Sequence, residues 1–375
     1  MRRHATDAGH GLIRLVGGKI EAFIEGDVVG HWQTCRYFTY CRSKPVAVSF
    51  IRHIHISRAA SGLQQRLTVS WSHIILVISK GRFHSLYVRV MKLVMTLLVR
   101  DEEDILAANL DFHLKHGVDF FIATDNLSID HTPEILRSYE QRGLLHYMHE
   151  PADDYSQHRW VARMARLACT EYAADWVINS DADEFWWPLH GDLKQVLGAM
   201  PPPCCGALVE RTNFVPRPRS VDDFFADVMT LRERQSFNAL GQPLPGKVCH
   251  RAFPDIEIDQ GNHGIHRHGQ ALAVMPTDIV ILHFPVRSYL QFANKISKGG
   301  AAYERNTDLP HGLGATWRHL YKIWQRGEFE DYYRRLIVDA TEAADDGRLL
   351  FDDRLKLFFL RLRSRPAGMI SHDGL

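Results

Sequence analysis

Four apolar runs between residues 91 and 179 constrain the fold of this 375-residue chain more than any other feature of its sequence. Continuous apolar runs of this length are typical of strands that are buried on both faces of a parallel sheet. Segments with helical spacing separate the runs, so the sequence predicts an α/β fold with a mostly parallel sheet flanked by helices. The predicted strands are Lys92–Val99, Val118–Thr124, Leu144–Met148 and Trp176–Asn179.

Helix signals fill the intervals between these strands. Apolar residues recur at helical spacing from Ile105 to Leu114, with Asp101 as the expected N-cap and Gly117 as the end of the helix. Proline in a first turn predicts a second helix that starts around Asp130. A third helix is expected over residues 157–172.

The sequence after Pro188 predicts shorter elements and a helical C-terminal part. Strands are expected at 207–212, 247–252 and 279–283, and helices at 192–200, 288–298, 317–326 and from Phe329 onward. Residues 216–245 are rich in Pro and Arg, which predicts a loop or lid. Ligands of open α/β sheets bind beyond the carboxyl ends of the strands, so the residues that follow each strand are the functional candidates.

The first ninety residues differ in charge from the rest. They hold thirteen Lys and Arg against four Asp and Glu, although the formal net charge of the whole chain is only +1. We expect a basic N-terminal extension at 1–90, a catalytic domain at 91–300 and a helical region at 301–375. The extension is either an arm that touches a membrane surface or nucleic acid, or a stretch outside the native protein. The regular pattern that begins at Met91 favours the second interpretation.

Three features that the sequence lacks predict the cellular location of the protein. It has no apolar run of about 18 residues that could span a membrane, and no signal peptide at its start. Its six cysteines form no C-x-x-C pair, which favours reduced thiols. The near-zero net charge gives no indication of a nucleic-acid partner for the catalytic region. A cytoplasmic location, with loose peripheral contact at the inner face of a membrane, is therefore expected.

The sharpest chemical signal is the run Asn179-Ser180-Asp181-Ala182-Asp183-Glu184-Phe185, where an apolar strand leads directly into three acids. Asp181 and Asp183 can point toward one cation, because hard divalent ions take carboxylate oxygens and keep open positions for phosphate and water. The alternative is an acidic turn that only caps the next helix. The position at the end of the fourth strand favours a metal site, for Mn²⁺ or Mg²⁺.

Residues 91–188 resemble family 2 glycosyltransferases, in the branch whose D-x-D motif reads D-x-D-E-F. The first strand ends in Val99-Arg100-Asp101-Glu102-Glu103, where that family usually has an N-E-E-like sequence. The second ends in the run from Thr124 to Thr132, which is similar to the family's D-N-x-S-x-D-x-T. Asp101 in place of Asn and His131 in place of Gly depart from the family pattern.

This resemblance implies a GT-A fold and transfer of a sugar from a nucleotide-diphosphate sugar to a saccharide or glycolipid acceptor. It further implies inversion at the anomeric carbon and a role in surface-polysaccharide assembly. Glu102, Asp125 and Asn126 would lie near the nucleoside, and His283, which ends a late strand, would join Asp181 and Asp183 at the metal. Asp259 is the preferred general base for the acceptor hydroxyl, with Asp255, Glu257 and Glu210 as alternatives.

Cations are needed to balance the charge of a departing diphosphate. The candidates are basic residues on either side of the acidic motif in the sequence. They are Arg159, Lys247, Arg287, Lys295 and Lys298.

Three other functions are considered. His250, His263, His266 and His268 crowd together with His283 and could form a zinc hydrolase site, although no helical H-E-x-x-H is present. A nucleotidyltransferase can share this sheet, but would carry a Gly-rich basic segment where Arg100–Asp104 is acidic. A non-catalytic nucleotide-sugar-binding protein is the third alternative.

Overall fold

The computed structural model divides the chain into two units, Met1–Val90 and Met91–Leu375. In the second unit it describes residues 91–220, 223–310, 312–338 and 347–364, and in the first it describes the backbone of the strands alone. Each unit is therefore considered by itself.

The described part of the first unit consists of antiparallel strands, none of which was predicted from the sequence. β1 (Gly11–Val16) pairs with β2 (Lys19–Ile24). A four-stranded sheet follows the chain order β3-β4-β5-β6. The β-branched and aromatic residues of these segments favour strands even without strict alternation. The strands of this sheet are β3 (Thr34–Cys41), β4 (Lys44–Ile56), β5 (Val69–Ser79) and β6 (Arg82–Val88).

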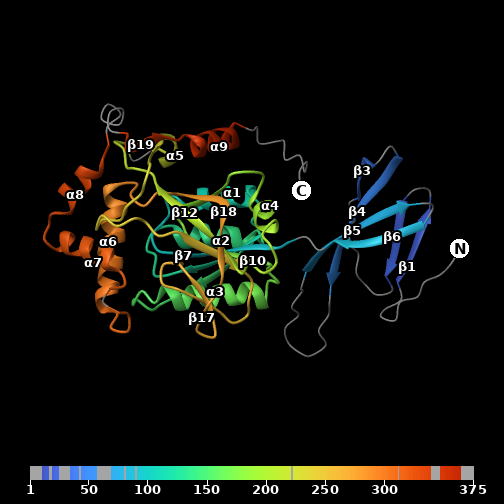
Figure 1. Cartoon of the computed structure of the whole chain (residues 1–375), viewed down its shortest axis with the longest axis horizontal. Helices are drawn as coiled ribbons and strands as arrows, with labels where there is room; N and C mark the ends of the chain where they lie inside the picture. The colour runs from blue at the N-terminus through green and yellow to red at the C-terminus, as the bar shows by residue number, and fades with distance from the viewer. Residues whose placement is uncertain are drawn as a thin grey trace. The chain divides into compact units, whose positions relative to one another are not determined.

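The second unit is built on an eight-stranded sheet with the order β11-β18-β12-β14-β10-β7-β8-β9 (Figure 1). β7 (Leu93–Val99), β8 (Phe120–Asp125), β9 (Leu145–His149) and β10 (Trp176–Asp181) are the four predicted strands, and their neighbouring pairs are parallel. The predicted α/β fold with a mainly parallel sheet is thereby confirmed.

The remaining strands of this sheet make it mixed. β14 (Lys247–Arg251) runs antiparallel to both β10 and β12 (Gly206–Asn213). β18 (Val274–His283) is parallel to β12 and antiparallel to β11 (Glu184–Pro188). As a result, three strand ends that are far apart in the chain meet at one end of the sheet. They are the ends of β10, β12 and β18, and the start of β11 lies beside them.

Helices α1 (Leu106–Lys115), α2 (Thr132–Gln141) and α3 (Gln157–Thr170) lie where helices were predicted. Asp101 was wrongly predicted as the N-cap of α1. The helix starts five residues later, and Asp101 adopts a left-handed φ of 53°. Its carboxylate instead accepts bonds from Ile129 and from side chains of α6 (Tyr289–Arg305). By contrast, Asp192 does cap α4 (Leu193–Gly198), through a reciprocal bond pair with Gln195.

Helix α6 continues through Gly299 and Gly300, where the sequence analysis ended it at Lys298. A Cβ atom at either glycine would collide with the ring of Trp317 or with Tyr321 on α7 (Ala315–Gln325). The glycines therefore permit close packing of two helices and do not break the first one. Trp317 also packs against Tyr155 and Tyr303, with ring centroids 5.5 Å and 6.1 Å away.

Smaller elements complete the second unit. The predicted loop at 216–245 contains α5 (Phe225–Val228) and β13 (Leu231–Glu233), and β13 pairs with β19 (Leu349–Phe351). The others are β15 (Ile256–Ile258), β16 (Ile265–Arg267), β17 (Gln270–Ala271), α8 (Phe329–Leu336) and α9 (Arg354–Arg363).

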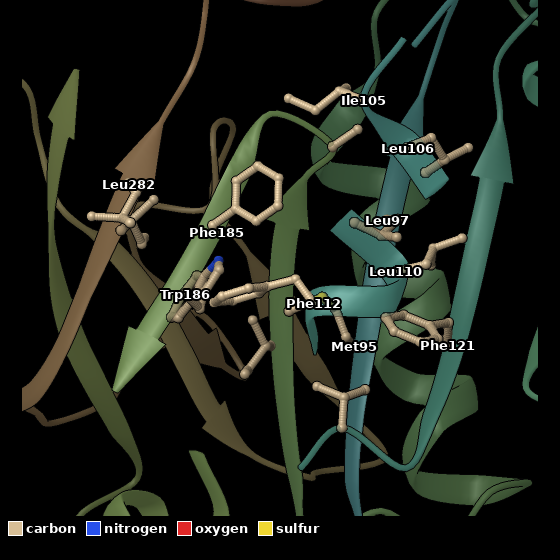
Figure 2. Packing of buried hydrophobic residues seen from close by; sticks show 14 of the residues in the cluster. Met95, Leu97, Ile105, Leu106, Leu110, Phe112, Phe121, Phe185, Trp186 and Leu282 are labelled. Atoms are coloured by element: carbon tan, nitrogen blue, oxygen red, sulfur yellow. The ribbon is translucent and has the colours of Figure 1, made fainter. Parts of the chain in front are cut away.

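A core of fully buried side chains between α1 and the sheet fixes the strands that lead to the acidic motif. Figure 2 shows Phe112 of α1 beside Phe185 and Trp186 of β11. Phe112 and Phe185 meet edge to face, with ring centroids 5.2 Å apart. Trp186 donates its indole N–H to the Ser180 hydroxyl at 2.9 Å. These contacts join the end of β10 to the start of β11, so the turn between them has a defined shape.

Acidification is expected to destabilise this fold through His113 of α1. Its buried ring has Nδ1 next to the Asn109 carbonyl and accepts the backbone N–H of Trp186 at Nε2, and burial lowers its pKa to about 3. The unfolded chain then binds more protons below about pH 6.5, so stability falls as pH falls, by about 2 kcal/mol between about pH 7 and 5. Urea unfolding across this range measures the slope. His113→Gln should flatten it, and an unchanged slope would contradict the assignment.

Two further observations concern the described residues. None of their helices combines the length and apolar character that a membrane span requires. Cys169, Cys204, Cys205 and Cys249 are free thiols.

Candidate active site

The acidic motif forms a tight turn between β10, which ends at Asp181, and β11, which begins at Glu184. Asn109 of α1 donates from its buried amide to the carbonyls of Ala182, at 2.9 Å, and Glu184, at 2.8 Å. The two hydrogen bonds fix the backbone on either side of Asp183. The packed core beneath the turn therefore sets the direction of the Asp183 carboxylate.

Asp183 is 1% exposed, and its two carboxylate oxygens have different surroundings. Oδ2 accepts from Lys295 Nζ at 2.5 Å and lies 4.0 Å from Arg287. Oδ1 accepts no hydrogen bond from any residue that the structure describes, and it lies 3.6 Å from Nε2 of His283. Burial alone would raise the pKa of Asp183, but Lys295, His283 and Arg287 hold it well below its usual range. A charged, buried oxygen without a donor requires a positive partner.

His283 presents a nitrogen lone pair to that oxygen. Its Nδ1 lies 2.8 Å from Oδ1 of Asn213 at the end of β12. The other group of the Asn213 amide, Nδ2, donates to Glu233 at 3.1 Å, so Oδ1 is the acceptor and His283 Nδ1 carries the proton. Burial lowers the pKa of His283 well below its usual value. The neutral ring therefore faces Asp183 with unprotonated Nε2, which is the form that binds metals.

Asp181 is part of a second ion cluster. Its Oδ2 accepts from Lys247 Nζ of β14 at 2.7 Å, and its Oδ1 lies 3.4 Å from the Gln157 amide. Lys247 also contacts Glu184 at 3.2 Å, and Arg211 contacts the same Glu184 oxygen at 3.2 Å. Burial raises the pKa of Glu184, although both cations oppose this.

A divalent cation fits Asp183 and His283 better than it fits the predicted set of three. Asp183 Oδ1, which accepts no hydrogen bond from the described residues, and His283 Nε2 could supply one oxygen and one nitrogen ligand, and they lie 3.6 Å apart. The described residues contain no group of three His, Cys, Asp or Glu side chains arranged for a metal. Asp181 points to Lys247 instead, because that buried cation neutralises it. Two protein ligands leave the open positions that phosphate and water occupy in transferases.

Behind this site, Arg287 forms a buried ion network with the segment after β7. It donates to both oxygens of Asp104 at 2.7 Å and to Glu102 at 2.5 Å. Lys295 lies 3.4 Å from the other oxygen of Glu102. Burial raises the pKa of Glu102 despite these two cations. The acids after the first strand therefore orient Arg287 and Lys295 beside Asp183.

A cavity of about 1350 Å³ opens in front of these clusters. Single small-molecule sites occupy roughly 300–1,000 Å³, so this cavity has room for more than one ligand. It brings together most of the predicted site residues. These are Glu102, Asn126, Asp181, Asp183, Lys247, His283 and Lys298, together with Lys295.

Asp125, Arg159 and Asp259 are among the predicted residues that lie outside its lining. Asp125 is 2% exposed and accepts from Ser128 and Tyr147, so it shapes the loop that presents Asn126. Arg159 is exposed and lies 3.8 Å from Asp308. Asp259, the preferred base, is half exposed and pairs with His266 at 3.1 Å. The structure gives none of the three an approach to the acidic motif through this cavity.

The histidines do not converge on one point. Of the crowded set, His263 and His283 line the cavity, whereas His250 is buried and bonded to the Arg251 carbonyl. His266 and His268 pair with different acids, Asp259 and Asp255. This arrangement gives no support to a zinc site built on the cluster.

Four residues of the site were not identified from the sequence, namely Asn109, Arg211, Asn213 and Glu233. Asn213 and Glu233 lie outside any motif. Asn213 meets His283 through the pairing of β12 with β18, and Glu233 contacts Asn213 from β13. A weak signal did exist, because Asn213 directly follows the strand predicted at 207–212.

The sequence model of glycosyltransferase family 92 matches residues 95–209, which run from β7 through the acidic motif into β12. This match supports the predicted enzyme class, glycosyltransferase, and names family 92 where the sequence resembled family 2. No curated protein matches the chain.

Several solved structures are similar at low identity. Residues 1–349 of S. aureus TarS have 11% identity and a TM-score of 0.34 over 67% of this chain and 77% of that one. The same protein in complex with UDP-GlcNAc has 12% identity and a TM-score of 0.34, with the same coverage. Mycobacterium tuberculosis glucosyl-3-phosphoglycerate synthase, solved with Mn²⁺, UDP and glucosyl-3-phosphoglycerate, has 13% identity and a TM-score of 0.28 over 67% and 82%.

Proposed function

We propose that this chain transfers a sugar from a nucleotide-diphosphate sugar to an acceptor hydroxyl, with inversion and with a divalent cation. The observation that carries the proposal is the pair Asp183 Oδ1, a buried oxygen that accepts no hydrogen bond from the described residues, and His283 Nε2, which lies 3.6 Å from it. The family match over the segment that contains Asp183 supports the reaction class.

The residues of the site have different roles in the proposed reaction. Asp183 and His283 would hold Mn²⁺ or Mg²⁺, which binds the diphosphate and stabilises its charge. Lys295 and Lys247 lie beside the acids, so their charges also balance the diphosphate as the bond to the sugar breaks. Glu102 keeps Arg287 and Lys295 in position. Asn126 is fixed by two carbonyls, of Glu150 and Ala152, at the rim where the nucleoside would bind.

Direct turnover tests this proposal. Purified full-length chain is incubated with a panel of UDP-sugars and GDP-sugars, with Mn²⁺ or with EDTA, and release of the nucleoside diphosphate is followed. We expect release with at least one donor and loss of that release in EDTA. Binding without turnover for every donor would instead favour the non-catalytic nucleotide-sugar-binding protein.

The setting of the reaction is proposed from the resemblance alone. A saccharide or glycolipid acceptor, surface-polysaccharide assembly and a cytoplasmic site near the membrane are consistent with it. The cavity is larger than a single ligand requires, so it has room for such an acceptor beside the donor.

A further inference from the structure

Glu233 is an acid of the cavity lining that differs from its neighbours in its partners. The other described acids of this lining are each paired with a lysine or arginine. Asp101 pairs with Lys298, Glu102 with Arg287, Asp181 with Lys247 and Asp183 with Lys295. Within the described residues, Glu233 forms no ion pair with any lysine or arginine, and its bonds are to Asn213, Ser236 and Phe237.

The arginines next to Glu233 in sequence have other partners. Arg232 donates to Asp352 at 2.9 Å, and Arg234 donates to the Gly347 carbonyl at 3.0 Å. Side chains alternate along β13, so Glu233 points to the opposite face from Arg232. Partial burial raises the pKa of Glu233 above its usual value, against hydrogen bonds that lower it. An unpaired carboxylate in such surroundings takes up a proton more readily than one held by a cation.

Its connection to the proposed metal site is direct. Asn213 uses Nδ2 for Glu233, at 3.1 Å, and Oδ1 for His283, at 2.8 Å. One amide and one imidazole ring therefore separate Glu233 from Asp183. The Ser236 hydroxyl accepts the backbone N–H of Asn213 at 2.9 Å and fixes this amide in place. Side chains from β12, β13 and β18 thereby fix the separation between Glu233 and His283.

We infer that Glu233 is the general base of the proposed transfer, and that the part of the cavity beside Asn213 and Glu233 is where the acceptor hydroxyl binds. The inference rests on the proposed function. In the step, the hydroxyl proton passes to the Glu233 carboxylate while the hydroxyl oxygen bonds to the anomeric carbon. The bond from that carbon to the diphosphate oxygen breaks, and its electron pair leaves with the diphosphate.

Glu233→Gln in the full chain tests the inference, with Asp259→Asn as the matched control because Asp259 is the base that the sequence favoured. The probe is the UDP-sugar or GDP-sugar that the wild type turns over fastest, with water as the acceptor and Mn²⁺ present. Glu233→Gln should slow diphosphate release on the order of 10²- to 10⁴-fold. Asp259→Asn should stay close to wild type. Calorimetric binding of the nucleoside diphosphate with Mn²⁺ should be unchanged in both.

Other outcomes overturn a defined part of the account. Wild-type turnover in Glu233→Gln overturns the inference alone, and so does a loss confined to Asp259→Asn. Weakened nucleotide binding or a lowered unfolding midpoint that accounts for the lost turnover would show a structural role and would also overturn it. Absence of turnover by the wild type with every donor would overturn the proposed function and this inference with it.

Discussion

Replacing Asp183 by asparagine is expected to reduce cation-dependent release of nucleoside diphosphate on the order of 10³-fold. The substitution keeps the size of the side chain and the bonds of the turn, but it removes the charge that faces His283 and Lys295. Asn109 still holds the carbonyls of Ala182 and Glu184, so the turn should keep its shape. Steady-state turnover and Mn²⁺ binding, measured on the same preparation, check this result.

Asp331→Asn is the control for Asp183→Asn. Asp331 lies on α8 with its side chain 71% exposed and contacts Arg334. The control should match the wild type in both measurements. Normal cation-dependent turnover in Asp183→Asn would refute the role given to this carboxylate.

Replacing Arg287 by methionine is expected to lower the free energy of unfolding by about 3–5 kcal/mol. The guanidinium is fully buried and is the partner of both Asp104 and Glu102. Methionine fills part of the space but leaves Asp104 without this partner and Glu102 with Lys295 alone, and an uncompensated buried charge is costly. Urea unfolding of the variant and the wild type measures the difference.

Arg334→Met gives the matched comparison. Arg334 contacts Glu330 at 2.5 Å, so the ion-pair geometry is similar, but both side chains are more than half exposed. Exposed pairs of this kind contribute at most about 1 kcal/mol. A small effect of Arg287→Met, equal to that of Arg334→Met, would argue against a buried network that orients the site.

The parallel half of the fold could be predicted because its signals are local. Each of β7 to β10 is an apolar run bounded by helix signals, and Asp181 and Asp183 follow the last of them directly. His283 was a candidate for the same reason, since it ends a strand. Parallel strands end at one edge of a sheet, so these residues come together whatever the details of the loops.

Predictions from the sequence were wrong where contacts between residues far apart in the chain determine the local structure. Aspartate is a common N-cap residue, but the partners of Asp101 are Asn294 and Lys298 of α6. Gly299 and Gly300 resemble a helix end until α7 packs against them. None of these partners lies within reach of a local pattern.

The proposed metal site contains both a residue set that a local motif predicted and contacts that it did not. Its two acids form a recognisable motif, but local spacing suggested that both act on one cation. The buried Lys247, which neutralises Asp181, comes from β14, which lies next to β10 in the sheet but 66 residues away in the chain. Asn213, which sets the tautomer of His283, is 70 residues from it.

Anomalous diffraction from crystals grown with Mn²⁺ and UDP tests the central claim most directly. The account predicts one manganese peak bound by Asp183 and His283, with the UDP diphosphate completing its ligands and Lys247 still paired with Asp181. A manganese ion bound elsewhere, with Asp183 still held by Lys295 and the diphosphate away from His283, would contradict it.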